Sequence, residues 1–376
     1  MTETEKLLRE LIALRSVNPA FLQEGHPDAG ESRVATFLGA TAAKAGLDVE
    51  FQQVAPGRSN VVARLSPVGK VQHRVFLLPH MDTVPPSSEA QFLPCVSNGR
   101  LYGRGACDTK GSVAAMLVAL TKLAKSGGPR PKTEIIFTGV IDEENAQAGS
   151  RALVGSGLRG DFAIVGEPTR LRVVTAHKGS VWLRLETRGK AAHGSCPDLG
   201  KNAVHAMARV VDFLETDYAG QLRKRRHPLL GCATVSVGSI KGGTQPNIVP
   251  DSCLASVDRR TLPGETEKSV LSELRSLLRK RGLKADIASE KSTFCLPMET
   301  DHRLPLAQTL LKIARQSAPI GVNYFCDASV LAAAGTPSVV FGPGDIAQAH
   351  TSDEWVSLAS LNQATQMLLK FIQSLP

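Results

Sequence analysis

The chain of 376 residues has few cysteines, few aromatic residues and no long apolar run. Its seven cysteines are scattered, their number is odd, and they include no Cys-x-x-Cys pair. This argues for reduced thiols in a cytoplasm and against a disulfide framework or a cysteine-zinc knuckle. The apolar runs, such as residues 113–120, are too short to span a bilayer, and no secretory signal is recognised at the start. We therefore expect a cytoplasmic protein without a membrane partner.

Aromatic residues make up only 5% of the chain, whereas the net charge is +9, from 44 basic and 35 acidic residues. A basic balance can indicate nucleic acid, anionic substrates or merely a soluble surface. The one dense basic run, residues 223–227, contains no aromatic residue, so we interpret it as a solvated helix end or loop. We expect no nucleic-acid partner.

Two common enzyme signatures are not found. The chain has no Gly-x-Ser-x-Gly elbow, which argues against a serine hydrolase. In the stretch that begins Gly103-Arg-Gly105, Asp108 stands where the dinucleotide-binding fingerprint has its third glycine. This stretch therefore does not indicate a dinucleotide-binding oxidoreductase.

The length favours two domains, because single cores rarely grow beyond about 250–300 residues. In the first and last parts of the chain, short apolar strands alternate with helices. This pattern predicts an α/β domain with a mostly parallel sheet flanked by helices on both faces. The expected strands are residues 61–65, 74–78, 134–141, 162–165 and 338–341. The expected helices are residues 4–15, 31–45, 110–125, 149–154, 304–316, 328–334 and 358–375.

The middle of the chain has a different pattern. The expected elements there are strand 181–187, helix 202–216, strands 233–239 and 248–257, helix 265–281 and strand 284–288. The order β-α-β-β-α-β is that of a ferredoxin-like α+β sandwich. We therefore predict a catalytic domain of residues 1–174 and 291–376, interrupted by an inserted domain of residues 175–290.

Side chains that can bind metal ions stand at the ends of several expected parallel strands. They are His80, Asp82, Glu143, Glu144, Glu167 and His350, and Asp108 precedes the helix at residues 110–125. Because the carboxyl ends of parallel strands meet at one edge of a sheet, these side chains can converge. Each one alone is more simply read as a structural histidine, a solvated acid pair or a loop residue. Together they predict a zinc site, since mixed imidazole and carboxylate ligands suit zinc.

The charges favour two divalent ions. Asp108, Glu144, Glu167 and one hydroxide would balance their charge, whereas clustered carboxylates without a metal would be costly to bury. Glu143 then remains free to take a proton from water, whose pKa a metal lowers from ~15.7 to about 7.

Several motifs resemble one known family. They are residues 78–85 (LPHMDTVP), 102–111 (YGRGACDTKG), 142–144 (DEE), 166–168 (GEP) and 342–350 (GPGDIAQAH). They are similar to the family of acetylornithine deacetylase, succinyl-diaminopimelate desuccinylase and carboxypeptidase G, which are two-zinc amidohydrolases and metallopeptidases. The resemblance covers nearly the whole chain, and residues 342–350 are most similar to the acetylornithine deacetylase branch. It implies a zinc-aminopeptidase-like catalytic domain and an inserted lid and dimerisation domain.

The resemblance also implies the metal ligands. Asp108 would bridge two zinc ions, with His80 and Glu167 completing one site and Glu144 and His350 the other. Co²⁺ or Mn²⁺ would be possible substitutes. A non-catalytic binding module on the same scaffold would be marked by the loss of a ligand, and all five are present.

Five further residues match functional positions of the family. Asp82 corresponds to the residue that holds the first histidine, and Glu143 to the general base. In the insert, His193 corresponds to a histidine that stabilises the oxyanion and often reaches across a dimer. Arg260 corresponds to the arginine that grips the substrate carboxylate, and Asn247 to its neighbouring asparagine. The alternatives for the last three are a satisfied loop histidine, a surface arginine and a plain turn.

We therefore predict a hydrolase that cleaves the amide bond of an N-acyl amino acid, as acetylornithine deacetylase does. A zinc-bridging hydroxide would attack, with Glu143 as the general base. A succinyl-diaminopimelate desuccinylase, an aminoacylase, or a carboxypeptidase or dipeptidase of the same family remain alternatives. We expect a homodimer formed through the inserted domain.

Overall fold

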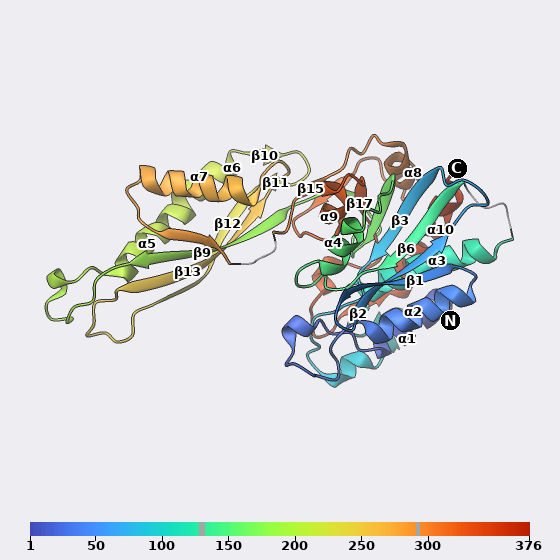
Figure 1. Cartoon of the computed structure of the whole chain (residues 1–376), viewed down its shortest axis with the longest axis horizontal. Coiled ribbons are helices and arrows are strands. Elements are labelled where there is room, and N and C mark those ends of the chain that lie inside the picture. Colours follow the sequence, from blue (N-terminus) through green and yellow to red (C-terminus); the bar gives the residue numbers. More distant parts are fainter. Residues whose placement is uncertain (128–131, 291–293) are drawn as a thin grey trace. The chain divides into compact units, whose positions relative to one another are not determined.

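The computed structural model describes residues 1–127, 132–290 and 294–376, which form two compact units (Figure 1). Unit 1 consists of Met1–Thr175, Thr300–Ile320 and Cys326–Pro376, and unit 2 consists of Ala176–Glu299 and Gly321–Phe325. The predicted insert was residues 175–290, so unit 2 extends beyond it. The predicted end of the insert adjoins residues 291–293, which lie outside the described residues. The inclusion of Gly321–Phe325 in unit 2 could not be predicted from the sequence, because it depends on tertiary contacts. One of these places the Phe325 ring 5.7 Å from the Arg260 guanidinium.

Unit 1 is built on a mixed sheet with parallel strands at its centre. The strand order is β1 (Asp48–Ala55), β2 (Arg58–Leu65), β6 (Thr133–Gly139), β3 (His73–Pro79), β7 (Phe162–Gly166), β17 (Ser338–Val340) and β8 (Val174–His177). The strands β6, β3, β7 and β17 are parallel, whereas β1, β2 and β8 pair antiparallel with their neighbours. Every residue of β6 and β7 is buried, as expected for strands that are covered on both faces. The predicted mostly parallel sheet is confirmed.

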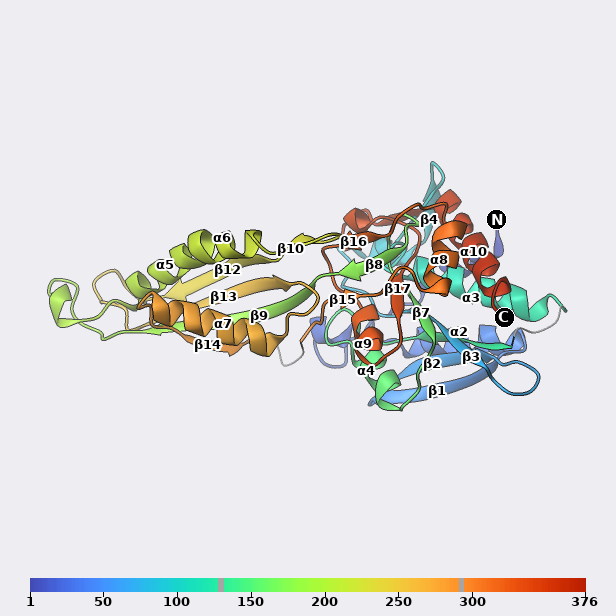
Figure 2. The same ribbon diagram turned by 90° about the horizontal axis from the view of Figure 1, so that it is seen from above.

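The helices of unit 1 form close to the residues predicted for them, and they are labelled beside the sheet in Figure 2. One apolar core joins the sheet to α1 (Glu3–Ala13), α2 (Ser32–Lys44), α3 (Lys110–Lys125), α8 (Pro305–Ile313) and α10 (Leu358–Gln373). The shorter helices α4 (Ala148–Gly155) and α9 (Ala328–Ala333) pack against each other, and α9 also contacts β17 and β7. Within the described parts of the chain, no helix is both long enough and apolar enough to cross a membrane.

Two features of unit 1 were not predicted. Strand β1 has mostly exposed or partly exposed residues, so it gave no apolar run to recognise. A small antiparallel sheet is formed by β4 (Cys95–Ser97), β5 (Arg100–Tyr102) and β18 (Trp355–Ser357). It pairs the chain just before Asp108 with the chain just after His350, which are far apart in the sequence.

Unit 2 has the predicted β-α-β-β-α-β order, with its three larger helices covering one face of a four-stranded antiparallel sheet (Figure 1). The elements are β9 (Gly179–Arg188), α5 (Ala203–Phe213), α6 (Ala219–Arg223), β12 (Thr234–Gly242), β13 (Ser252–Thr261), α7 (Glu267–Lys280) and β14 (Asp286–Ser289). The short strands β10 (Arg226–His227) and β11 (Gly231–Cys232) pair with each other, whereas β15 (Met298–Glu299) and β16 (Ile320–Val322) pair with β8. The sheet order β12-β13-β9-β14 is that of a ferredoxin-like sandwich.

Strand β13 begins later than predicted. Residues 248–257 were expected as a strand, but the strand is Ser252–Thr261. Pro250 cannot donate a hydrogen bond to a neighbouring strand, and residues 248–251 lie outside β13, with Ile248 in an isolated bridge to His193. The basic run at residues 223–227 ends α6 and forms the two-residue strand β10.

Candidate metal centre

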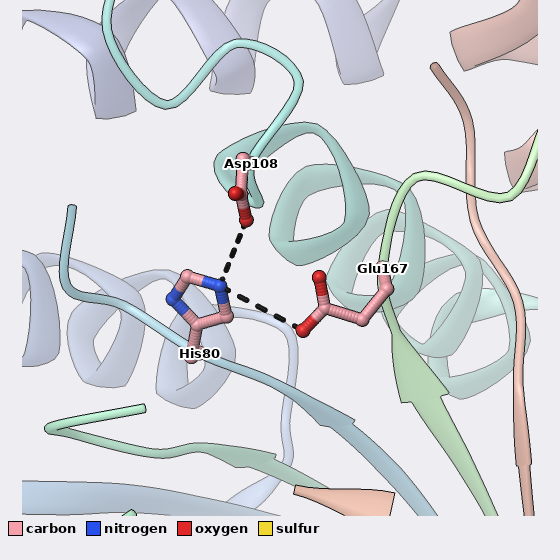
Figure 3. Close-up of side chains that lie close together, drawn as sticks. All are labelled: His80, Asp108 and Glu167. Carbon is pink, nitrogen blue, oxygen red and sulfur yellow. Dashed lines mark hydrogen bonds and ion pairs between the residues drawn. The ribbon is translucent and has the colours of Figure 1, made fainter. Parts of the chain in front are cut away.

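Three buried donors meet where two neighbouring parallel strands end (Figure 3). His80 directly follows β3, Glu167 directly follows β7, and Asp108 lies just before α3. The His80 Nε2 atom is 3.1 Å from Asp108 Oδ1 and 3.8 Å from Glu167 Oε1. The parallel sheet therefore brings together residues that are distant in the sequence.

A second group of donors shares Asp108. The His350 Nε2 atom is 3.2 Å from Asp108 Oδ2 and 3.2 Å from Glu144 Oε2. In each group the three ligand atoms lie within 4.8 Å of one another. Because the two oxygens of Asp108 face different histidines, this carboxylate is placed to be shared by two cations.

The charges of this centre call for positive counter-ions. Burial raises the pKa values of Glu143, Glu144 and Glu167, and neighbouring carboxylates raise them further. For Glu143 and Glu167 the pKa lies well above the usual range. Burial also acts to raise the pKa of Asp108, but hydrogen bonds to His350 and His80 outweigh it and lower this pKa. Imidazole and carboxylate donors so close together fit divalent ions, zinc among them, which would neutralise the carboxylates.

The same carboxylates act on the two histidines. Hydrogen bonds to Asp108 and Glu144 raise the pKa of His350 to about 10. For His80, burial acts to lower the pKa, but hydrogen bonds to Asp108 and Asp82 outweigh it and raise the pKa well above its usual value. Metal ions would compete with these protons for the same nitrogen atoms.

Asp82 organises more of the centre than predicted. Its backbone oxygen lies 3.0 Å from His80 Nδ1, and its carboxylate oxygen Oδ1 lies 3.4 Å from the same nitrogen. Its carboxylate also accepts hydrogen bonds from the backbone N–H groups of Glu143 and Glu144, each at 3.1 Å. One buried side chain thus orients the first histidine and anchors the acid pair.

Two sets of supporting contacts were not predicted from the sequence. The buried Asn18 donates to Asp82 Oδ2 at 2.8 Å and to Asp142 Oδ1 at 3.0 Å. Arg58 forms an ion pair with Glu31, whose carboxylate accepts a hydrogen bond from the Asp142 backbone N–H at 3.2 Å. Asp142 has φ 67°, so these contacts hold a left-handed turn directly before Glu143. No local pattern links residues so distant in the sequence.

The remaining predicted site residues belong to unit 2. His193 is exposed, and its Nδ1 atom lies 2.7 Å from Ser195 Oγ. Asn247 lies beside it, because the Gly194 backbone N–H donates to the Asn247 backbone oxygen at 2.7 Å. Arg260 donates from Nε to Asp258 Oδ2 at 2.9 Å.

His193 and Arg260 lie near opposite ends of the unit 2 sheet. Arg260 pairs with Ser180 near the start of β9, whereas Arg188 pairs with Ser252 at its other end and His193 comes after it. At about 3.3 Å per residue, this length of strand separates them by roughly 25 Å. The resemblance implied a histidine that often reaches across a dimer, and this separation is compatible with that expectation. The His193 and Arg260 of one copy of unit 2 therefore cannot contact the same small molecule.

Comparisons with known proteins agree with these observations. Residues 76–374 match the peptidase family M20/M25/M40. The acetylornithine deacetylase of Myxococcus xanthus is 33% identical over 83% of both chains. An acetylornithine deacetylase of Vibrio cholerae is 29% identical over 92% of both chains.

Solved structures show the same fold. A tripeptidase from Staphylococcus aureus has a TM-score of 0.80 at 23% identity and covers 99% of this chain and 97% of its own. An M20 family metallo-carboxypeptidase from Sulfolobus solfataricus has a TM-score of 0.78 at 19% identity and covers 99% of both chains. The predicted fold class and the predicted family resemblance are confirmed. The chain belongs to peptidase family M20/M25/M40 and is a metallopeptidase or amidohydrolase of that family.

Proposed function

We propose that the chain hydrolyses the amide bond of N-acyl amino acids, with N-acetylornithine as the first candidate substrate. The acetylornithine deacetylases at 29–33% identity support this substrate class. The observation that carries the reaction type is the Asp108 carboxylate, whose two oxygens lie 3.1 Å and 3.2 Å from two different histidines.

Asp108 would hold two divalent cations together, with zinc as the first candidate. His80 and Glu167 would complete one site, and Glu144 and His350 the other. When bound, such ions would polarise the amide carbonyl and lower the pKa of water, so that hydroxide would be available to attack the carbonyl at neutral pH.

Glu143 would act as the general base. Its backbone N–H is held by Asp82, whereas its carboxylate has no hydrogen bond or ion pair to another residue among those the structure describes. The carboxylate is therefore free to accept the proton of the attacking water and to pass it to the departing amine nitrogen.

Arg260 would bind the substrate carboxylate, and His193 would donate a hydrogen bond to the oxyanion. Arg260 suits this role because its Nε already donates to Asp258, which orients the guanidinium. Asn247, beside His193, would assist in binding. Since His193 and Arg260 lie near opposite ends of one sheet, both can serve one substrate only if two copies of the chain supply them. We therefore include a homodimer formed through unit 2 in the proposal.

A substrate panel tests this function. The metal-loaded protein should show its highest kcat/KM on N-acetylated amino acids, compared with N-succinyl amino acids, dipeptides and tripeptides. A preference for N-succinyl substrates would instead indicate a desuccinylase, and a preference for peptides a peptidase.

Mixed dimers test the shared site. His193→Ala and Arg260→Ala chains should each have little activity alone. Mixing them should restore part of it, because a hybrid dimer contains one site with both residues intact. No recovery in a demonstrated hybrid dimer would reject the shared site.

A further inference from the structure

A buried ion pair lies behind the donors of the candidate centre. Arg104 Nη1 donates to Glu354 Oε2 at 2.6 Å, and both residues are 1% exposed. Arg104 lies in the loop that leads to Asp108, and Glu354 lies in the segment that follows His350. Neither side chain belongs to either group of metal donors. The pair therefore joins two donor-bearing segments without taking part in the donor set.

Glu354 holds the backbone of the Asp108 loop. Its Oε1 accepts from the backbone N–H groups of Cys107 at 2.9 Å and Asp108 at 3.0 Å. Its Oε2 accepts from the Gly105 N–H at 3.0 Å, in addition to Arg104. A carboxylate suits this position because both of its oxygens only accept hydrogen bonds. The position of the Asp108 backbone thus depends on one buried side chain.

Arg104 holds the segment that carries His350. Its Nη2 donates to the backbone oxygen of Thr351 at 3.2 Å, and Gln91 Nε2 donates to the same oxygen at 3.1 Å. Thr351 directly follows His350, which is about half exposed, has φ 62° and lies outside helices and strands. Bonds to its neighbour are therefore important for the placement of His350.

Backbone hydrogen bonds also join the segment before Asp108 to the segment after His350. The Gly103 N–H donates to the Glu354 backbone oxygen at 3.0 Å, and Trp355 of β18 pairs with Tyr102 of β5. By contrast, His80 and Glu167 directly follow β3 and β7 of the main sheet and have no direct bond to Arg104 or Glu354 among the described residues. Loss of the ion pair should therefore affect the His350 group more than the His80 group.

We propose that Arg104 and Glu354 are positioning residues that align Asp108 with His350 and so set the affinity of the site formed by Asp108, Glu144 and His350. The inference rests on the proposed metal centre and adds that the site containing His350 depends more strongly on this ion pair than the site containing His80.

The test is Glu354→Gln in the full-length protein. Glutamine keeps the size of the side chain but has only one acceptor oxygen, so its NH2 group would face N–H donors, either those of Cys107 and Asp108 or those of Gly105 and Arg104. Titration of the metal-free protein with Zn²⁺, in competition with a chelator, should show two sites in the wild type. The variant should keep one site and bind the second ion about 10- to 100-fold more weakly, as is usual when a residue supporting a ligand is lost.

Glu134→Gln is the matched control. Glu134 is also a buried carboxylate of unit 1, paired with Arg74 at 2.7 Å, but it lies at the start of β6, away from the donors. This variant should change the melting temperature of the metal-free protein without changing the affinity for either ion. Equal weakening of the second site in both variants would overturn the proposal, and so would wild-type affinities in Glu354→Gln.

Two further measurements distinguish a folding defect and a failure of the proposed centre from a failure of the positioning role. If Glu354→Gln does not fold, Arg104→Lys replaces it, because lysine keeps the charge but lacks the planar group that reaches both Glu354 and Thr351. It should weaken the second ion in the same direction, and unchanged affinity would reject the positioning role. A wild-type protein that binds no divalent ion would instead reject the proposed centre itself.

Discussion

The two groups of donors that share Asp108 are built differently. His80 and Glu167 are buried and stand directly at the ends of two neighbouring strands of the sheet. His350 is about half exposed and lies in a loop with a left-handed backbone. The first group is thus determined by the sheet, whereas the second depends on bonds between loops. The comparison shows that two sites with similar donors can differ in how firmly they are held.

The largest expected effect comes from the residue that the groups share. Asp108→Asn should lower the metal content from two ions per chain to nearly none and abolish turnover, because a neutral amide cannot bridge two cations. Asp161→Asn is a matched control, since Asp161 is an exposed carboxylate of the same unit. Elemental analysis of the purified proteins checks this. Retention of one tightly bound ion by Asp108→Asn would show that the two groups are independent.

A variant of Glu143 should distinguish loss of catalysis from loss of metal binding, because Glu143 belongs to neither group of donors. Glu143→Gln should keep two ions per chain but lose about 10²- to 10⁴-fold in kcat, the usual contribution of a general base. Metal content and kcat should be measured on the same sample. Substantial remaining turnover with both ions bound would remove Glu143 from this role.

Arg260 belongs to neither group. Arg260→Ala should raise KM for an N-acetyl amino acid by about 10- to 100-fold, which corresponds to the ~1.5–3 kcal/mol of a hydrogen bond to a charged group. The same substrate with its carboxylate converted to an amide is the control and should show little change. An equal loss on both substrates would reject the carboxylate contact.

Single histidine variants compare the groups directly. His80→Ala should lower the free energy of unfolding of the metal-free protein by about 1–3 kcal/mol, because it leaves buried partners unsatisfied. His350→Ala removes a half-exposed side chain and should change it by about 0.5 kcal/mol or less. Chemical denaturation checks both values. Equal losses would show that the second group is held as firmly as the first.

The smallest expected effect is a pH dependence of the metal-free protein. The pKa of His350 is raised from its ordinary value to about 10. Its charged form therefore stabilises the fold fully below an unfolded-state pKa of about 6.5, and this contribution is lost as the pH rises through about 10. Because the His350 side chain is about half exposed, solvent screens this contribution, and between pH 7 and 10 the melting temperature should fall only slightly more in the wild type than in His350→Ala. Parallel curves would show that the ion pairs of His350 do not contribute.

Much of this arrangement was predictable from the sequence. The apolar runs that became β3, β6 and β7 indicated buried parallel strands, and His80, Glu144 and Glu167 stand just after them. The ferredoxin-like order of unit 2 was predictable for the same reason, since its strands alternate and its helices are amphipathic. Local patterns of this kind depend only on residues that are neighbours in the sequence.

The supporting contacts were not predictable. Asn18 reaches Asp82 across 64 residues, and Glu354 reaches the Asp108 backbone across 246. A single buried polar side chain has no periodicity, so nothing in the local sequence distinguishes such a partner from an ordinary surface residue.

By itself, the sequence determined which side chains could serve as donors and that the ends of parallel strands would gather them, because strand patterning and chain order are local properties. Only the tertiary structure decided which oxygen of Asp108 faces which histidine, that Arg104 and Glu354 lie behind it, and that His193 and Arg260 stand near opposite ends of one sheet. These relations depend on strand register and on hydrogen bonds between distant segments, which form only when the whole chain is packed.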